Sequence, residues 1–172
     1  MKTPIRGELM VAEDSNEFAD MAAALFLKLA KQSRGRFVVG LAGGSTPRPL
    51  YQTLARLPWK EAVDWTNVVM VLGDERFVSP DNADSNFRMI REALFDHVGI
   101  PESQIVSVPF NGLTVEQAAE QYERKLREIY GEDGLEAGRE FFNLNFLGRW
   151  RSLAPPPIRM LQHRQLRAIY SA

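Results

Sequence analysis

The sequence has 172 residues, 25% of them charged, and no cysteine, so it can bury one hydrophobic core but cannot form disulfides, thiolate metal sites or a cysteine nucleophile. The first thirty residues carry five acids, which excludes a secretory signal peptide, and the longest apolar run, 22–30, contains Lys28 and is too short to span a bilayer. We therefore expect a cytoplasmic protein without a membrane partner.

Charge divides the chain into two parts. Residues 1–148 contain all 22 acids and 16 of the 21 lysines and arginines, a net charge of −6, whereas residues 149–172 contain five arginines and no acid. An acidic body excludes general nucleic-acid binding, because affinity for phosphate backbones needs a clustered basic surface. We expect an α/β domain over 1–148 and a distinct basic, proline-rich tail over 149–172.

The first half of the chain alternates between helical and strand patterns. A helix is predicted from Ser15, with Asp14 or Ser15 as its N-cap and with an apolar face at Phe18, Met21, Ala22, Leu25 and Leu29. The runs 36–42 and 67–74 are apolar at consecutive positions, which is typical of strands buried on both faces of a sheet. Residues 47–57, between these runs, have a helical pattern.

The second half repeats the alternation. Residues 85–98 predict a helix capped by Asp84 or Ser85, with Phe87, Ile90, Leu94 and Val98 on one face. A strand is predicted over 105–110, then a helix that opens with a capping box at Thr114 and Gln117 and stops at Gly131, and then a strand over 141–148. This order predicts an α/β fold with an open, mostly parallel, Rossmann-like sheet flanked by helices.

The stretch GLAGGSTPRP, residues 40–49, leaves the first predicted strand and enters a helix at Ser45, Thr46 and Pro47. Free N–H groups and the dipole of a helix N-terminus attract anions, and glycines let the backbone approach them. We therefore predict a phosphate site at Gly43, Gly44, Ser45 and Thr46. The alternative is a strand-to-helix turn with a serine cap and no ligand. The stretch is neither a P-loop nor a dinucleotide-binding G-x-G-x-x-G motif.

A second motif, GDERFVSPDNADSNFRMI at residues 73–90, starts at the end of the next predicted strand. Because ligands gather at this edge of an α/β sheet, Asp74, Glu75 and Arg76 are expected to face the same crevice as the glycine loop. The guanidinium of Arg76 offers a planar fork for phosphate oxygens. A solvated cluster of opposite charges is the alternative interpretation.

The segments LAGGSTPRPLY and VLGDERFVSPDNADSNFRMIREALF resemble the 6-phosphogluconolactonases, within the wider group that includes glucosamine-6-phosphate isomerases and deaminases. The resemblance extends over about residues 5–148. The run Asp-Glu-Arg followed by Asp-Ser-Asn is similar to the lactonase branch, whereas the amino-sugar branch usually has Asp-Glu-Tyr there. An amino-sugar-phosphate isomerase or deaminase is therefore the alternative.

The resemblance implies hydrolysis of 6-phosphoglucono-δ-lactone in the oxidative pentose phosphate pathway, without a metal or an organic cofactor. It implies that Arg76 joins the glycine loop in holding the sugar phosphate and that Asp74 orders the site, with Arg48 as a further candidate. Hydrolysis of an ester also needs a base to activate water and donors for the developing oxyanion. The family is expected to use a histidine as that base.

This chain departs from the family pattern after Gly148. The family continues with a glycine-rich loop and Asp-Gly-His, but here the chain reads RWRSLAPPPIRMLQHRQLRAIYSA. We interpret His97 as a structural residue near a helix end, and His163 lacks the neighbouring residues of the motif, so no catalytic residue is assigned.

We expect a change of reading frame near Gly148 that leaves the sheet incomplete at its C-terminal end. A divergent natural terminus and an interaction tail that folds on an acidic partner are the alternatives. Two functions follow: a lactonase whose activity in this chain is low or absent, and a non-catalytic module that binds sugar phosphate.

Overall fold

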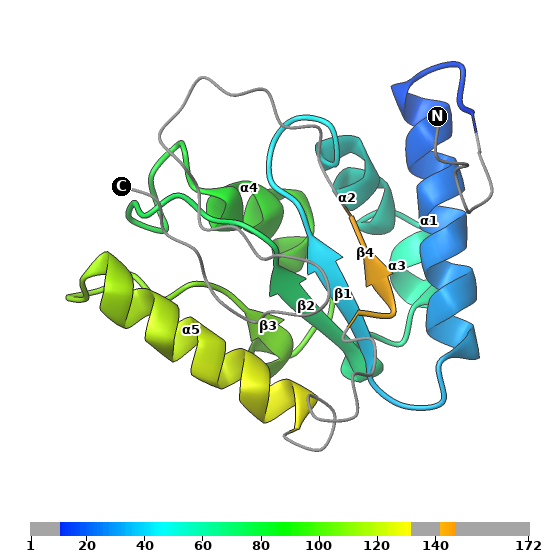
Figure 1. The fold of residues 1–172 in the computed structure, drawn as a ribbon. Coiled ribbons are helices and arrows are strands. Elements are labelled where there is room, and N and C mark those ends of the chain that lie inside the picture. The colour runs from blue at the N-terminus through cyan, green and yellow to red at the C-terminus, as the bar shows by residue number, and fades with distance from the viewer. Residues whose placement is uncertain (1–10, 132–141, 147–172) are drawn as a thin grey trace, which may run out of the picture.

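The computed structural model describes residues 11–131 and 142–146 (Figure 1). Four parallel strands form one sheet in the order β3-β2-β1-β4, which confirms the predicted α/β class. The strands are β1 (Phe37–Leu41), β2 (Val68–Leu72), β3 (Ile105–Val106) and β4 (Leu144–Asn145). The α-helices are α1 (Ser15–Gln32), α2 (Arg48–Leu54), α3 (Trp59–Ala62), α4 (Asn86–Ala93) and α5 (Val115–Tyr130). Three 3-10 segments are η1 (Trp65–Asn67), η2 (Phe95–His97) and η3 (Glu102–Gln104).

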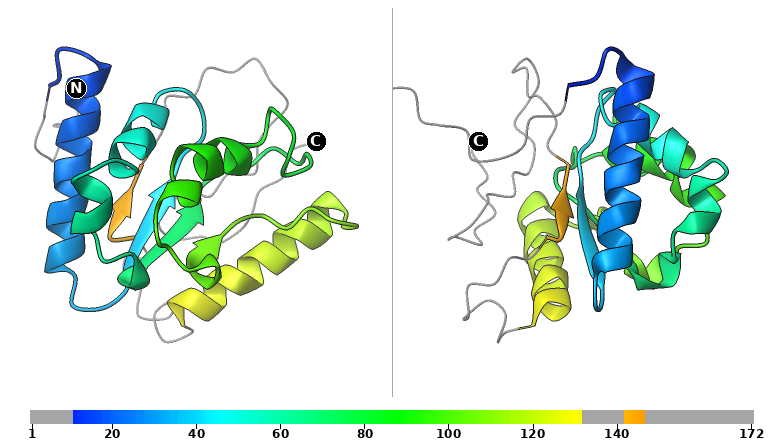
Figure 2. Two further views of the ribbon diagram at one scale, coloured as in Figure 1. Left: turned by 180° about the vertical axis from the view of Figure 1, so that it is seen from behind. Right: turned by 90° about the vertical axis from the view of Figure 1, so that its right-hand side faces the viewer.

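Helices cover both faces of the sheet (Figure 2). The side chains of β1 and β2 are all buried and alternate between the two faces, as a pleated strand requires. Phe37, Val39 and Leu41 join the core under α1, α2 and α4, whereas Val38 joins the core under α5. This arrangement explains why both strands are continuous apolar runs in the sequence.

Three of the predicted helix starts are confirmed by their caps. Asp14 caps α1, since its Oδ1 accepts hydrogen bonds from the backbone N–H groups of the first turn. Ser85 caps α4, and Thr114 forms the predicted capping box with Gln117 at the start of α5. Gly131 follows α5 with φ of +76°, a backbone conformation that favours glycine.

The predicted apolar face of α1 is confirmed only in part: Ala22 and Leu29 pack against the core, but Phe18 and Leu25 do not lie at its centre. The buried residues are Ala19, Ala23 and Phe26, while Phe18 is 43% exposed and Leu25 is 37% exposed. Phe26 lies in an edge-to-face contact with Phe37, at 5.3 Å between ring centroids, and this aromatic contact sets which side of the helix faces the core. The small side chains of Ala19 and Ala23 then complete the buried face.

Four other elements are shorter than predicted. The third strand covers only Ile105–Val106, because β3 is an edge strand and Pro109 cannot donate to a ladder. The helix expected over 85–98 ends at Ala93, and the helix expected over 47–57 ends at Leu54. The predicted fourth strand pairs with β1 only at Leu144–Asn145, and its residues 141, 147 and 148 lie outside the described residues, as does the whole tail 149–172. No described helix is long and apolar enough to cross a membrane.

Candidate functional site

The two predicted motifs lie at the same edge of the sheet. Leu41 and Leu72 end their strands in register, and the N–H of Gly73 donates to the carbonyl of Leu41 at 2.7 Å. The loops that follow β1 and β2 therefore leave the sheet side by side at its carboxyl edge. In open parallel sheets this edge is where ligands bind.

Two tyrosines hold the ends of these strands from opposite faces. The hydroxyl of Tyr51 in α2 donates to the carbonyl of Ala42 at 2.8 Å, and the hydroxyl of Tyr122 in α5 donates to the carbonyl of Leu72. Burial raises the pKa of both hydroxyls above the ordinary tyrosine value. Both tyrosines therefore stay protonated at neutral pH and act as donors to the backbone.

The glycine loop differs from the expected helix start. Residues 45–47 form a turn, and α2 begins only at Arg48, with Pro47 as an N-cap that makes no side-chain hydrogen bond. Ser45 and Thr46 are exposed and do not cap the helix. The backbone N–H groups of residues 44–46 donate no hydrogen bond to any described residue. Successive free N–H groups in such a turn are suited to an anion.

Asn86 joins the two motifs. Its Nδ2 donates to the carbonyl oxygen of Asp74 at 3.0 Å and to Oδ2 of Asp74 at 3.2 Å, while its Oδ1 accepts from Nη1 of Arg76. The side chain is 2% exposed, and it lies against Gly43, where a Cβ atom would be 1.9 Å from its Oδ1. Sequence reasoning missed this residue. A polar residue directly after the Ser85 cap was the available signal.

Asp74 and Gly43 are linked directly. The N–H of Gly43 points to Oδ1 of Asp74 over a long 3.5 Å. Gly43 therefore leaves space for the Asn86 side chain, and its N–H points to Asp74. The N–H groups of Gly44, Ser45 and Thr46 donate to no described residue. Asp74, in the loop after β2, thus contacts both Gly43 in the loop after β1 and Asn86 at the start of α4.

Glu75 does not face the crevice, so that part of the expectation is wrong. It is 6% exposed, and its carboxylate accepts from the N–H groups of Arg76, Asn86 and Phe87 at 2.7–2.8 Å and from Oγ of Ser85 at 3.1 Å. The side chain turns to the first turn of α4 because a carboxylate is stabilised by the free N–H groups and the dipole of a helix N-terminus. Glu75 therefore holds α4, and with it Asn86, against the end of β2.

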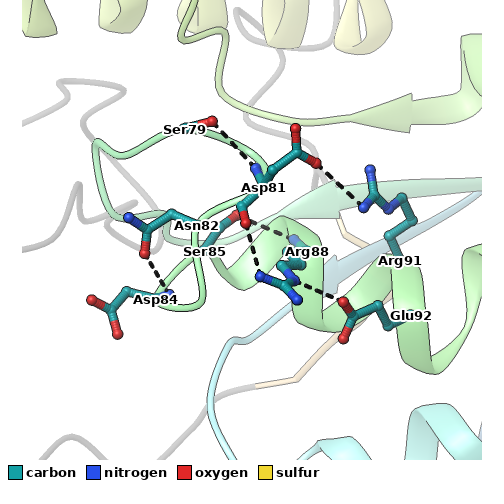
Figure 3. A network of polar contacts seen from close by, with 8 residues as sticks. All are labelled: Ser79, Asp81, Asn82, Asp84, Ser85, Arg88, Arg91 and Glu92. Carbon is teal, nitrogen blue, oxygen red and sulfur yellow. Dashed lines mark hydrogen bonds and ion pairs between the residues drawn. The ribbon is translucent and has the colours of Figure 1, made fainter.

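Figure 3 shows how the loop before α4 is braced. Arg88 donates from Nη1 to the carbonyl of Asp81 at 2.8 Å and forms an ion pair with Glu92 at 2.7 Å, and Arg91 lies 3.5 Å from Asp81. The hydrogen bond from Arg88 lowers the pKa of Glu92. Arg88 and Arg91 are therefore engaged with acids of their own loop and helix.

Arg76, unlike Arg88 and Arg91, forms no ion pair with a described carboxylate. It is exposed, and besides Asn86 it reaches only the carbonyl of Asp84, at 3.5 Å, among the described residues. Arg48, the further candidate, is exposed at the start of α2 and likewise has no ion pair in the described ranges. Because a neutral amide and not a carboxylate positions the guanidinium of Arg76, its positive charge is not compensated and can pair with an anion.

A small pocket lies beside Arg76. Its lining includes Phe77 and Phe110, whose ring centroids are 5.1 Å apart, together with Glu75, Phe87, Ser107 and Pro109. The volume of about 50 Å³ holds a few water molecules and not a hexose phosphate. This pocket alone therefore does not hold the whole of such a ligand.

The described part of the chain contains one of the two histidines. His97 is exposed in η2, and its Nε2 lies 2.9 Å from the carbonyl of Glu92 near the end of α4. That contact agrees with a structural role. His163 lies outside the described residues. Across 11–131 and 142–146, no group of three or more acidic or histidine side chains is arranged to hold a metal ion.

The fold is a Rossmann-like α/β sheet with two loops that meet at its carboxyl edge, and comparison with known proteins gives the family. Residues 13–149 match the family described as glucosamine-6-phosphate isomerases/6-phosphogluconolactonase, and the chain belongs to this family. It is 42% identical over 116 residues to the 6-phosphogluconolactonase of Synechocystis. The aligned segment covers 67% of this chain and 45% of the Synechocystis protein.

Solved structures agree with this result. The 6-phosphogluconolactonase of Thermotoga maritima matches 68% of this chain and 52% of its own, with a TM-score of 0.58 and 34% identity. The 6-phosphogluconolactonase of Trypanosoma cruzi matches 73% of this chain and 52% of its own, with a TM-score of 0.62 and 27% identity. The chain thus spans about half the length of the relatives that it matches.

Proposed function

We propose that this chain carries the phosphate-binding part of a 6-phosphogluconolactonase site and that the reaction served by the site is hydrolysis of 6-phosphoglucono-δ-lactone to 6-phosphogluconate. The observation that carries the proposal is that Asn86 contacts both Arg76, which has no carboxylate partner among the described residues, and Gly43. Gly43 directly precedes residues 44–46, whose N–H groups donate to no described residue. Family membership supplies the substrate class. We place the reaction in the cytoplasm and assign it no cofactor.

In this proposal each element of the site has one role. Gly44, Ser45 and Thr46 donate N–H groups and hydroxyls to phosphate oxygens, and Arg76 supplies positive charge from the next loop. Gly43 leaves room for Asn86, and Asp74 and Asn86 hold the two loops at a fixed spacing. A bound phosphate would then orient the lactone ring relative to the base that activates water.

The base itself is not assigned to any residue. His97 contacts a helix carbonyl, and the Asp-Gly-His that the family resemblance implies does not occur in the 172 residues of this sequence. We therefore expect this chain to bind the phosphate group while turning the lactone over far more slowly than its relatives. This departure favours a second candidate, a sugar-phosphate-binding module without catalysis.

Calorimetric titration with 6-phosphogluconate, gluconate and glucosamine 6-phosphate tests the proposal. We expect 6-phosphogluconate to bind, gluconate not to bind, and Arg76→Ala to weaken binding about tenfold or more, since a charged hydrogen bond to phosphate is lost. Arg91→Ala is the matched control, because Arg91 is engaged with Asp81. Equal affinity for gluconate would overturn the phosphate site, and stronger binding of glucosamine 6-phosphate would favour the amino-sugar branch.

The rate of lactone opening, measured above the buffer background, separates the two candidate functions. A rate gain that Arg76→Ala removes supports a lactonase, whereas binding without any rate gain supports the module. Turnover equal to that of the Synechocystis relative would contradict our expectation for this chain.

A further inference from the structure

Helix α1 has apolar side chains on a side that does not face the core. In the described part of the chain the exposed large apolar residues are Val11, Phe18, Leu25 and Leu57. Phe18 and Leu25 are seven positions apart, so they lie on the same side of α1, and the partly buried Met21 lies between them. At 100° per residue, Phe18 and Leu25 lie roughly 110–130° around the helix from the centre of its buried side.

No described element covers this side of the helix. In Figure 1, α1 forms one side of the molecule, and the right-hand view of Figure 2 shows its length with no other described element in front of it. The contacts that α1 makes with other helices are with α2 and α3. A row of exposed apolar side chains on an open helix face is typical of a surface that binds another protein.

The charges of α1 are divided between its two halves. Glu17 and Asp20 are exposed in the first half, and Lys28 and Lys31 are exposed in the second half. None of them forms an ion pair with a described residue, although Oε2 of Glu17 accepts a hydrogen bond from the N–H of Glu13 at 2.5 Å. The helix dipole favours this division of charge, but it does not account for the apolar side chains beside the charges. A helix with an acidic and a basic half is complementary to a second copy of itself that runs in the opposite direction.

The spacing of these residues fits an antiparallel pair of α1 helices. When Phe18 and Leu25 take the a positions of a heptad, Met21 takes the d position between them. In an antiparallel pair the a residues of one helix lie opposite the d residues of the other, so Leu25 lies opposite the partner's Met21. Glu17 and Lys31 take g positions, which flank the apolar residues, and the same register brings Glu17 next to the partner's Lys31. Two-fold symmetry forms each of these contacts twice.

We propose that α1 docks a second copy of this chain through an antiparallel, two-fold symmetric contact of Phe18 and Leu25. Glu17 pairs with Lys31 of the partner subunit, and the aliphatic stem of Lys28 covers the partner's Phe18. Because 18 helical residues span only about 27 Å, the interface is small, and we expect a weak dimer with a Kd of about 1–100 μM. The proposal concerns association only and is independent of the ligand that the phosphate site takes.

Sedimentation equilibrium of the 172-residue chain, without substrate, tests the proposal. We expect the average mass to rise with concentration from that of one chain toward twice that value. Phe18→Asp and Leu25→Asp should each weaken association about tenfold or more, as is usual for interface anchors. Both positions are exposed in the single chain, so circular dichroism should show a retained fold. Leu57→Asp is the matched control, because Leu57 is an exposed apolar residue outside α1. The mass of one chain at every concentration, or an equal loss with Leu57→Asp, would overturn the proposal.

An exchange of charges tests the antiparallel register. Glu17→Lys and Lys31→Glu should each weaken the dimer about fivefold or more, because like charges then face each other at both contacts. A 1:1 mixture of these two variants should associate as strongly as the unsubstituted chain, because opposite charges face each other again. Asp20→Lys is the control, since it makes the same charge change on α1 away from Phe18 and Leu25 and should have a smaller effect. A mixture that associates no better than either variant alone would overturn the proposed contact. Because no substrate is present, that result leaves the phosphate-binding proposal unaffected.

Discussion

Gly43, in the loop after β1, and Asn86, the first residue of α4, are in direct contact. A Cβ atom at position 43 would lie 1.9 Å from Oδ1 and 2.0 Å from Cγ of Asn86, closer than real Cβ contacts come. Since Asn86 also holds Arg76 and Asp74, the absent side chain of Gly43 is what permits the whole network.

Gly43→Ala should therefore disturb both stability and ligand binding. The methyl group displaces a buried side chain that has polar partners, and we expect the free energy of unfolding to fall by about 1–3 kcal/mol, as for other overpacked sites. Urea unfolding measures the change. Gly35→Ala is the control, because a Cβ at Gly35 meets nothing within 4 Å; equal effects of the two substitutions would contradict the contact.

Asn86→Ala should weaken phosphate binding, although we do not assign the Asn86 side chain a contact with the ligand. Arg76 loses the acceptor that orients its guanidinium, and Asp74 loses a donor, so we expect the Kd for 6-phosphogluconate to rise about 2- to 10-fold, the range of one or two net hydrogen bonds. Asn82→Ala in the loop before α4 is the control, since Asn82 contacts Asp84 and not Arg76. An unchanged Kd for Asn86→Ala would show that Arg76 is positioned by other groups.

Glu75→Gln should destabilise the start of α4. The carboxylate accepts from three backbone N–H groups and from Ser85, and an amide is a weaker acceptor that also brings its own donors into a buried position. We expect a loss of about 1–3 kcal/mol in the free energy of unfolding. Glu92→Gln, at an exposed ion pair, should have a smaller effect in the same urea titration. The role assigned to Glu75 fails if the two losses are equal.

Because two tyrosines are buried, we predict that the free energy of unfolding falls at alkaline pH. Burial raises the pKa of Tyr51 and of Tyr122 in the folded chain, whereas both titrate near pH 10 once the chain is unfolded. Their protonated forms therefore contribute full stability below about pH 10, and this contribution is lost as the pH rises further.

Urea unfolding at a series of pH values from 8 to 11 measures this effect. We expect the double variant Tyr51→Phe, Tyr122→Phe to be less stable at pH 8, because two hydrogen bonds to strand carbonyls are removed. Above pH 10 its stability should fall less steeply than that of the unsubstituted chain. Identical slopes would mean that other groups cause the alkaline transition.

Local patterns in the sequence determined the elements and the two motifs. Continuous apolar runs predicted β1 and β2, and Ser85 and the Thr114 capping box predicted where α4 and α5 begin. These signals are reliable because each depends on residues within a few positions of one another. The glycine loop and Arg76 were predicted as site residues in the same way, since each lies in the loop that follows a strand.

Only the tertiary structure decided which of these residues meet. Asn86, at the start of α4, contacts Gly43, which lies 43 positions earlier in the chain. Glu75 turns to α4 because the N–H groups of that helix start donate to its carboxylate. The orientation of α1 was set by the contact of Phe26 with Phe37, which helical periodicity alone does not reveal. Periodicity shows that a helix has an apolar side; which part of that side is covered depends on the neighbours that the fold brings to it.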